Sequence, residues 1–453
     1  MSANNHPTRD FHGSRPPKSD QSNPSSRFGF EHFDLGPALQ RGIAALGFEE
    51  PRPIQTQALP AALAGRDVLG LAQTGTGKTA AFALPILQRI LAAGPQPGPR
   101  ALVVAPTREL AAQISAEIAA LAKFTKIKVA TVFGGVSVFR QRKALSAKPE
   151  IVVACPGRLL DLMGQGIVRL NRIETLILDE ADHMFDMGFL PDIRRIIAAL
   201  PAERQNLLFS ATMPKEIRGL ADRILRDPKV VDVEHSKPLE TIEHALYPVE
   251  SGRKVALLER ILAADETASA IVFTRTKHRA RRLAQQLERS GHRAVALQGN
   301  MSQAARDRAM DGFRKRRFDV LVATDIAARG IDVQGVSHVV NFDMPNTTDA
   351  YTHRIGRTGR SNNPGKAYTF VTAEDRCLVF QVEQRLGATI PRRQVDGIES
   401  IPFPLGRSDD RGSQPLGRPQ GRPQGRSSPG NGKSNGRPRS RRARYRRTST
   451  TGC

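Results

Sequence analysis

A glycine-rich segment carries the clearest chemical signal in the sequence. Residues 72–79 read AQTGTGKT, follow a short apolar run and precede a predicted helix over residues 80–91. Glycines let backbone N–H groups turn toward phosphate oxygens, and a helix N-terminus adds its positive dipole end. Lys78 can neutralise outer phosphates, and the Thr79 hydroxyl can help hold Mg²⁺. The general phosphate-loop pattern begins with glycine, where this chain has Ala72.

Two adjacent carboxylates give a second signal further along the chain. Asp179 and Glu180 directly follow the apolar run 175–178, and Asp182 comes two residues later. A carboxylate at the end of a strand suits a magnesium ligand, and its neighbour suits a residue that polarises water. An acidic cluster at such a position is also a common helix N-cap. Together with the phosphate loop, the pair predicts a nucleoside triphosphatase.

Both motifs need a scaffold that brings the ends of separate strands together. Short Val, Ile and Leu runs alternate with amphipathic stretches, which is typical of parallel strands buried on both faces. We therefore predict an α/β protein with two parallel-sheet lobes. A polar stretch at residues 234–250 interrupts the rhythm and is the best candidate for the domain boundary, and a short linker is expected to join the two lobes. The predicted strands cover residues 68–71, 101–105, 151–154, 175–178, 206–209, 270–273, 320–323 and 338–342.

The overall composition limits the class of protein. The 453 residues carry a net charge of +24 with 39% hydrophobic residues, which is enough for packed cores. No apolar run approaches the roughly 18 residues of a membrane span, and the N-terminus has no secretory h-region. Cys155, Cys377 and Cys453 are too widely spaced to indicate a disulfide scaffold or a zinc site. We expect a cytoplasmic protein that has no membrane contact and binds a polyanion.

Much of the positive charge lies at the C-terminal end. Residues 404–453 contain twelve arginines and one lysine against two aspartates, in a background of Gly, Pro, Gln and Ser. So few apolar side chains cannot offset the entropy of ordering, which predicts disorder. The predicted organisation is a disordered tail over residues 1–27, lobes over residues 28–236 and 237–396, and a basic Arg/Gly-rich disordered tail over residues 397–453.

Four segments resemble, in order and spacing, the motifs of DEAD-box RNA helicases. They are AQTGTGKT at residues 72–79, DEAD at 179–182, SAT at 210–212 and HRIGRTGR at 353–360. The resemblance extends from about residue 28 to residue 390. Members of this family have alanine at the position of Ala72, so the departure from the general phosphate-loop pattern is expected. Residues 204–212 and 272–278 look most like the bacterial RhlE subgroup. The family implies two tandem RecA-like lobes and RNA-stimulated ATP hydrolysis coupled to duplex unwinding or ribonucleoprotein remodelling.

The resemblance also implies roles for individual residues of the ATP site. Its catalytic residues would be Lys78, Asp179, Glu180 and two arginine fingers, Arg357 and Arg360. Thr79 and Asp179 would hold Mg²⁺. The nucleotide would be held by Phe30, Phe48, Gln55, Thr74, Gly75, Thr76, Gly77, Lys78, Thr79, Gly330 and Asp332. Coupling between the lobes would use Asp182, Ser210, Thr212, His353 and Arg354.

The implied RNA contacts lie in loops that follow strands. They are Pro106, Thr107, Arg108, Gly135, Arg158, Thr274, Arg275, Gly299 and Thr324. Such residues suit phosphate and sugar contacts rather than base reading, so we expect largely sequence-independent binding of structured or duplex RNA. The family usually has threonine where this chain has Cys155. A thiol is a weaker hydrogen-bond donor than a hydroxyl, so we expect weaker RNA affinity.

Two functions from different classes fit these features. The first is an ATP-dependent RNA helicase, acting on ribosomal precursors or together with RNA-decay proteins. The second is an RNA-binding scaffold or annealing chaperone that works through the basic tail, in which ATP only controls the attachment to RNA. Arg/Gly-rich tails bind RNA without sequence preference, but the complete set of ATP-site residues favours the enzyme.

Overall fold

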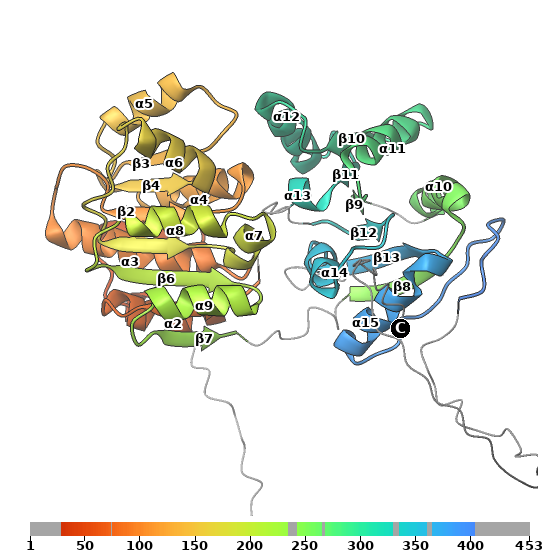
Figure 1. Ribbon diagram of the computed structural model, residues 1–453, viewed down its shortest axis with the longest axis horizontal. Helices are drawn as coiled ribbons and strands as arrows, with labels where there is room; N and C mark the ends of the chain where they lie inside the picture. The colour runs from red at the N-terminus through yellow and green to blue at the C-terminus, as the bar shows by residue number, and fades with distance from the viewer. Residues whose placement is uncertain are drawn as a thin grey trace, which may run out of the picture. The chain divides into compact units, whose positions relative to one another are not determined.

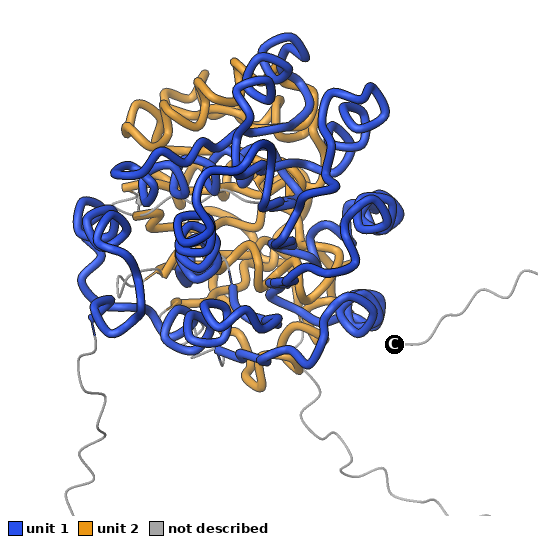
Figure 2. Tube along the Cα trace, turned by 90° about the vertical axis from the view of Figure 1, so that its left-hand side faces the viewer, with its two compact units in different colours: residues 1–236, 329–331 blue, residues 237–328, 332–453 orange. Residues whose placement is uncertain are grey.

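The computed structural model describes residues 29–73, 75–233, 242–264, 268–328, 335–359 and 365–403. The predicted tail segments 1–27 and 404–453 lie outside the described residues. Residues 397–403, which we had assigned to the tail, are described. Ser400 forms a bridge with Val249, and its hydroxyl donates to the Pro248 carbonyl oxygen at 3.1 Å. The chain divides into two compact units, residues 1–236 with 329–331 and residues 237–328 with 332–453 (Figure 2).

The first unit is a parallel sheet of the order β3-β4-β2-β5-β6-β1-β7, covered by helices on both faces (Figure 1). Its strands are β1 (Val68–Leu71), β2 (Ala101–Val104), β3 (Val129–Val132), β4 (Ile151–Ala154), β5 (Thr175–Leu178), β6 (Gln205–Ser210) and β7 (Lys229–Asp232). One apolar core lies under η1 (Phe30–His32), α1 (Pro37–Ala45), α2 (Pro53–Leu63), α3 (Lys78–Ala93) and α4 (Arg108–Leu121). A second core lies under α6 (Pro156–Gly164), α7 (Ala181–Asp186), α8 (Leu190–Ala198) and α9 (Lys215–Ile224). Helix α5 (Val138–Ser146) follows β3.

The second unit is another parallel sheet, of the order β10-β11-β9-β12-β13-β8. Its strands are β8 (Ile242–Pro248), β9 (Ala270–Phe273), β10 (Ala294–Leu297), β11 (Val320–Ala323), β12 (His338–Asn341) and β13 (Gly365–Val371). Its helices are α10 (Lys254–Ala264), α11 (Lys277–Arg289), α12 (Gln303–Arg314), α13 (Asp325–Ala328), α14 (Thr348–Ile355) and α15 (Arg376–Leu386), with short turns η2 (Ser251–Arg253) and η3 (Ala373–Asp375).

The predicted fold of two parallel-sheet lobes is confirmed, and the polar stretch near the boundary between the lobes contains a strand that the sequence did not predict. Residues 242–248, where no strand was predicted, form the edge strand β8, which pairs in parallel with β13. Pro248 is tolerated there because it ends an edge strand, where its missing N–H breaks no central ladder. Among the described residues, no helix is long and apolar enough to cross a membrane.

Candidate active site

The phosphate loop turns between the end of β1 and the start of α3. Gly75 and Gly77 have φ angles of 88° and 92°, in the left-handed region that favours glycine. A Cβ atom added at Gly77 would lie 2.7 Å from Nε2 of Gln55 and 2.9 Å from the Arg52 side chain. Conformation and space therefore both require glycine at this position.

Lys78 links this loop to the acidic motif. Its side chain is buried, its ammonium donates to the Ala72 carbonyl oxygen at 3.1 Å, and it lies 3.5 Å from Oδ1 of Asp179. Burial alone would lower the pKa of Lys78, but Asp179, Glu180 and Asp182 together raise it above its ordinary value. The ammonium therefore stays charged at neutral pH, between the loop and the carboxylates.

Asp179 and Glu180 lie where β5 gives way to α7. Burial and the Glu180 charge raise the pKa of Asp179, against the opposing effect of Lys78. Glu180 has φ 53° and ψ 52°, a left-handed conformation that is uncommon outside glycine and often marks functional sites. Its N–H donates to Oδ1 of Asp179 at 3.0 Å. Its Oε2 lies 2.9 Å from Nδ1 of His183, with both side chains buried.

Asp182 connects the acidic motif to the end of β6. Its N–H donates to the Ser210 hydroxyl at 3.1 Å, and its Oδ2 accepts from the Thr212 N–H at 2.9 Å and the Thr212 hydroxyl at 3.1 Å. The Ser210 hydroxyl in turn donates to the Thr212 carbonyl oxygen at 2.7 Å. The three predicted coupling residues of this unit therefore form one hydrogen-bonded cluster, next in sequence to Glu180.

Gln55 holds the phosphate loop from α2. Its Nε2 donates to the Gly77 carbonyl oxygen at 3.0 Å, and its Oε1 accepts from the Arg52 N–H at 2.8 Å. Arg52 adds a second contact, from its guanidinium to the Gly75 carbonyl oxygen at 2.6 Å. Thr76 braces the loop from within, because its hydroxyl donates to the Gln73 carbonyl oxygen at 2.8 Å.

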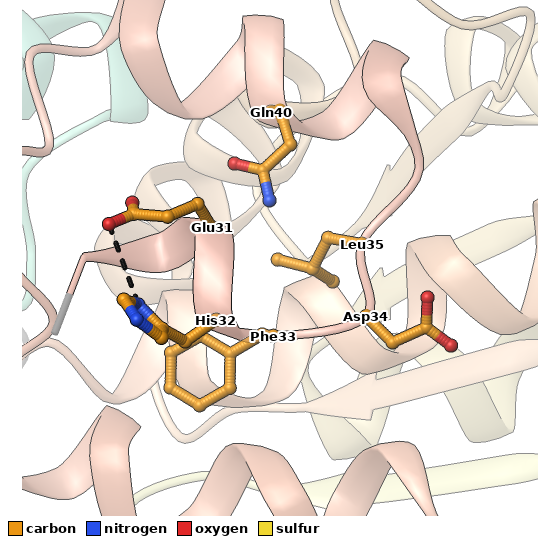
Figure 3. A pocket seen from close by; sticks show the side chains of 6 residues that line it. All are labelled: Glu31, His32, Phe33, Asp34, Leu35 and Gln40. Carbon is orange, nitrogen blue, oxygen red and sulfur yellow. Dashed lines mark ion pairs between the residues drawn. The ribbon is translucent and has the colours of Figure 1, made fainter.

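The two aromatic residues predicted to hold the nucleotide lie side by side. The rings of Phe30 and Phe48 stack with centroids 6.3 Å apart. Phe30 is buried and Phe48 is half-buried. A pocket open to solvent lies nearby, between η1 and α1 (Figure 3). Its lining residues are Glu31, His32, Phe33, Asp34, Leu35 and Gln40, without either ring of the stacked pair.

Three predicted RNA-contact residues meet at residues 133–137, the loop between β3 and α5. The Arg108 guanidinium lies against Gly135, where an added Cβ atom would be 2.1 Å from its Nη1. Arg158, on α6, donates to the Val136 carbonyl oxygen at 3.2 Å. Thr107 follows Pro106 and caps α4 by accepting from the Leu110 N–H at 3.3 Å.

Cys155 is the N-cap residue of α6, and its side chain makes no capping hydrogen bond. Burial raises the pKa of the Cys155 thiol to about 12, and the Glu109 charge adds to this while Arg108 opposes it. The thiol is free and stays protonated at neutral pH. Cys155 therefore has the character of a structural residue rather than a reactive one.

In the second unit, Asp343 organises the loop after β9. Its Oδ2 accepts from the Arg275 N–H at 2.9 Å, and its Oδ1 lies 3.0 Å from the Arg279 guanidinium. Thr274 is buried, whereas the Arg275 side chain is exposed. Burial lowers the pKa of the nearby Lys254, although Asp343 opposes this shift. Of the other predicted RNA contacts, Gly299 is exposed and Thr324 is half-buried.

Arg354 is held rigidly inside the second unit. It makes a bidentate pair with Asp325 at 2.5 and 2.8 Å, and it donates to Asn341 at 3.1 Å and to the Asp343 carbonyl oxygen at 2.7 Å. His353 precedes it on α14, and Arg357 follows in the turn after that helix. The predicted site residues Thr74, Gly330, Asp332 and Arg360 lie outside the described residues.

Several residues of this site were not predicted from the sequence. His183, Arg52 and Asp343 act through contacts with Glu180, Gly75 and Arg275. Two of them had a usable signal, because His183 directly follows the acidic motif and Asp343 lies just after a predicted strand. Their partners could not be predicted, because each contact depends on the local path of the backbone.

Comparison with known proteins decides the family. The model for DEAD/DEAH box helicases matches residues 52–220, and the model for the helicase conserved C-terminal domain matches residues 253–362. The chain is 43% identical over 357 residues to the DEAD-box ATP-dependent RNA helicase CshA of Bacillus subtilis, covering 78% of this chain and 72% of the relative. The chain belongs to the DEAD-box ATP-dependent RNA helicases. It is therefore an RNA-dependent ATPase and helicase, as predicted.

Further relatives and solved structures agree with this family. CshA of Geobacillus kaustophilus is 42% identical over 356 residues, covering 78% of this helicase and 76% of the relative. Dbp5 of S. cerevisiae bound to RNA and ADP BeF3 is 32% identical, with a TM-score of 0.73, over 81% of this helicase and 95% of Dbp5. Mss116p bound to ssRNA and AMP-PNP is 28% identical, with a TM-score of 0.72, over 80% of this helicase and 78% of the Mss116p chain. The predicted RhlE-like subgroup is not confirmed, because these curated relatives carry the name CshA.

Proposed function

We propose that Lys78, Thr79, Asp179 and Glu180 form the centre at which this helicase hydrolyses ATP. The observation that carries the proposal is the position of the Lys78 ammonium, between the Ala72 carbonyl oxygen and Asp179. A terminal phosphate in the loop would meet a cation already held in place by its surroundings. Thr79 and Asp179 offer the oxygen donors that Mg²⁺ prefers, and the bound ion would neutralise phosphate charge.

Glu180 positions the attacking water in this proposal. His183 holds one carboxylate oxygen through the 2.9 Å contact, which fixes the direction of the whole group. Asp182, Ser210 and Thr212 then tie the position of Glu180 to the end of β6. A shift of the acidic motif would therefore move the end of β6, and a shift there would move the acidic motif. Coupling of hydrolysis to RNA binding requires such a link.

The remaining nucleotide contacts follow the family pattern. Gln55, Phe30 and Phe48 would recognise adenine, Gly330 and Asp332 the ribose, and Thr74, Gly75, Thr76 and Gly77 the phosphates. Arg357 and Arg360 would act as arginine fingers, which are worth roughly 10³–10⁵ in rate. His353 and Arg354 would couple the lobes, and the rigid pairing of Arg354 with Asp325 suits a positioning role.

RNA would be held through its backbone by the loops of both units. In the first unit these are Pro106, Thr107, Arg108, Gly135 and Arg158, and in the second Thr274, Arg275, Gly299 and Thr324. We propose ribosomal precursors or RNA-decay assemblies as the physiological context and the cytoplasm as the location. Assignment to the RhlE-like subgroup also remains a proposal, based on residues 204–212 and 272–278.

The ATP-site assignment can be tested by removing the charge of Lys78. We expect Lys78→Gln to lower RNA-stimulated ATP hydrolysis by about 100-fold or more, as loss of a group that stabilises transition-state charge does. Lys126→Gln, at an exposed lysine of the same unit, is the matched control and should hydrolyse ATP at the normal rate. Normal turnover in Lys78→Gln would contradict the assignment.

A further inference from the structure

Helix α5 presents an unusual surface that the ATP site does not use. The Phe139 side chain is 74% exposed, more than any other large hydrophobic residue among the described residues. Three exposed cations accompany it, Arg140, Arg142 and Lys143. We call these four residues the α5 surface. Isolated exposed hydrophobic residues are ordinary, but an aromatic ring among cations is a combination typical of single-stranded nucleic-acid sites.

The exposure of Phe139 does not result from poor packing of the helix. On its inner side, Gln141 is buried and donates to the Phe133 carbonyl oxygen at 3.1 Å. Val138 and Leu145 pack against the core under α6 to α9. The helix is therefore anchored along one face, and the α5 surface is what the other face presents.

The cations of the α5 surface are not neutralised by neighbouring carboxylates of the described residues. Arg140, Arg142 and Lys143 form no ion pair with any carboxylate of the described residues, whereas Arg226 pairs with Glu203 and Arg293 with Asp319. Helix α5 also has no acidic residue in its first turn, where negative charge would be favourable. The helix thus carries uncompensated positive charge, which suits a polyanion.

The α5 surface continues from the proposed RNA contacts. Arg108 lies against Gly135, and Arg158 donates to the Val136 carbonyl oxygen at 3.2 Å, so both reach the loop that leads into α5. Figure 1 shows α5 at the outer end of the first unit, beyond the edge strand β3 and beside α6. Phe139, Arg142 and Lys143 are three and four residues apart, so they share one face of the helix.

We propose that the α5 surface binds single-stranded RNA that extends beyond the nucleotides held by Arg108, Gly135 and Arg158. Phe139 stacks on a base, and the cations contact the phosphates that flank it. Stacking tolerates any base, so the contact lengthens the RNA footprint without adding sequence preference. This inference rests on the RNA contacts of the proposed function.

RNA length separates the α5 surface from the core contacts. Binding of the full chain to uridine oligonucleotides of about 6 and about 25 nucleotides is measured by fluorescence anisotropy with AMP-PNP present. We expect Phe139→Ala to weaken binding of the longer RNA about tenfold and to leave the shorter RNA within about twofold. Phe139→Tyr, which keeps the stacking face, should bind like the wild type. Phe380→Ala, at an exposed phenylalanine of the other unit, is the matched control.

Charge gives an independent readout. Arg142→Gln combined with Lys143→Gln should make log Kd for the longer RNA less dependent on log salt, by a slope of about 1–2. The inference is overturned if Phe139→Ala binds the longer RNA like the wild type, or if it weakens both lengths equally. Arg158→Gln tests the underlying contacts separately, because it should weaken binding of the shorter RNA. If Arg158→Gln binds the shorter RNA like the wild type, the proposed RNA contacts of Arg158 are refuted. That result would leave the comparison of the two RNA lengths for Phe139→Ala unaffected.

Discussion

Replacing Cys155 by threonine should both stabilise the first unit and tighten RNA binding. Cys155 precedes α6 with φ −91° and ψ 143° and gives no side-chain cap. Among the described α-helices, three have a threonine N-cap with a similarly extended backbone, Thr107, Thr276 and Thr347. Each accepts from the N–H three residues later, at 3.1 to 3.3 Å. A hydroxyl at Cys155 would in the same way accept from the Arg158 N–H.

The size of the effect follows from this comparison. A hydroxyl N-cap contributes about 1 kcal/mol relative to a residue that cannot cap. In a unit of this size, that raises the midpoint of thermal unfolding by about 2–4 °C. The same hydroxyl can donate its proton to an RNA phosphate while accepting from the Arg158 N–H. A hydrogen bond to a charged group is worth about 1.5 kcal/mol or more, so RNA affinity should rise about tenfold.

Thermal unfolding, RNA anisotropy and RNA-stimulated ATPase rates test this prediction together. Cys155→Val is the matched control, because valine has nearly the shape of threonine and no hydroxyl. The threonine variant should exceed both valine and wild type in unfolding midpoint and in RNA affinity. Equal values for the threonine and valine variants would refute the reasoning. A higher unfolding midpoint of the threonine variant with unchanged RNA affinity would support the predicted helix cap and exclude the predicted phosphate contact.

Three further changes probe the site and the tail. His183→Ala should lower kcat for ATP hydrolysis about tenfold with little change in KM, because a charge-assisted hydrogen bond that orients Glu180 is lost. His183→Gln should restore part of the rate. Steady-state kinetics of His183→Ala equal to those of the wild type would contradict this prediction. Because the Cys155 pKa is raised to about 12, little thiolate forms below pH 10. Iodoacetamide should therefore label this residue slowly at pH 8 in the native protein and quickly in urea, and mass spectrometry would reveal fast native labelling if we are mistaken. Truncation after residue 403 removes a net charge of +11 and should leave the ATPase activity intact. RNA affinity should fall, and the remaining affinity should depend less on salt concentration. Loss of RNA binding and annealing together with the tail would instead favour the scaffold function.

The sequence predicted the central strands well and the edge strands poorly. Predicted strands such as 151–154 and 175–178 are buried along their whole length, so their apolar runs are continuous. Five strands were missed. Four of them, β3, β7, β8 and β10, lie at the edge of a sheet, whereas β13 lies inside the second sheet between β12 and β8. An edge strand packs on fewer neighbours and tolerates polar residues, as the exposed Lys229 and Asp232 in β7 illustrate. Periodicity alone therefore gives too weak a signal there.

The site divides along a similar line. The spacing of Lys78, Asp179 and Glu180 predicted that strand ends would bring them together, and Lys78 does lie 3.5 Å from Asp179. The support of Glu180 by His183 could not be predicted, because it depends on the left-handed backbone of Glu180. Nothing in the local sequence indicates that a glutamate will adopt this conformation. Motif spacing thus predicts which groups meet, whereas side-chain support requires the backbone path.

The most direct test of the account is the ATPase activity of Glu180→Gln. Hydrolysis is measured with RNA, with DNA of the same length and sequence, and without nucleic acid, alongside ATP-dependent RNA binding. We predict that the wild-type chain is stimulated by RNA far more than by DNA, and that Glu180→Gln binds ATP and RNA but does not turn over. Full turnover in Glu180→Gln, or equal stimulation by DNA, would contradict the account.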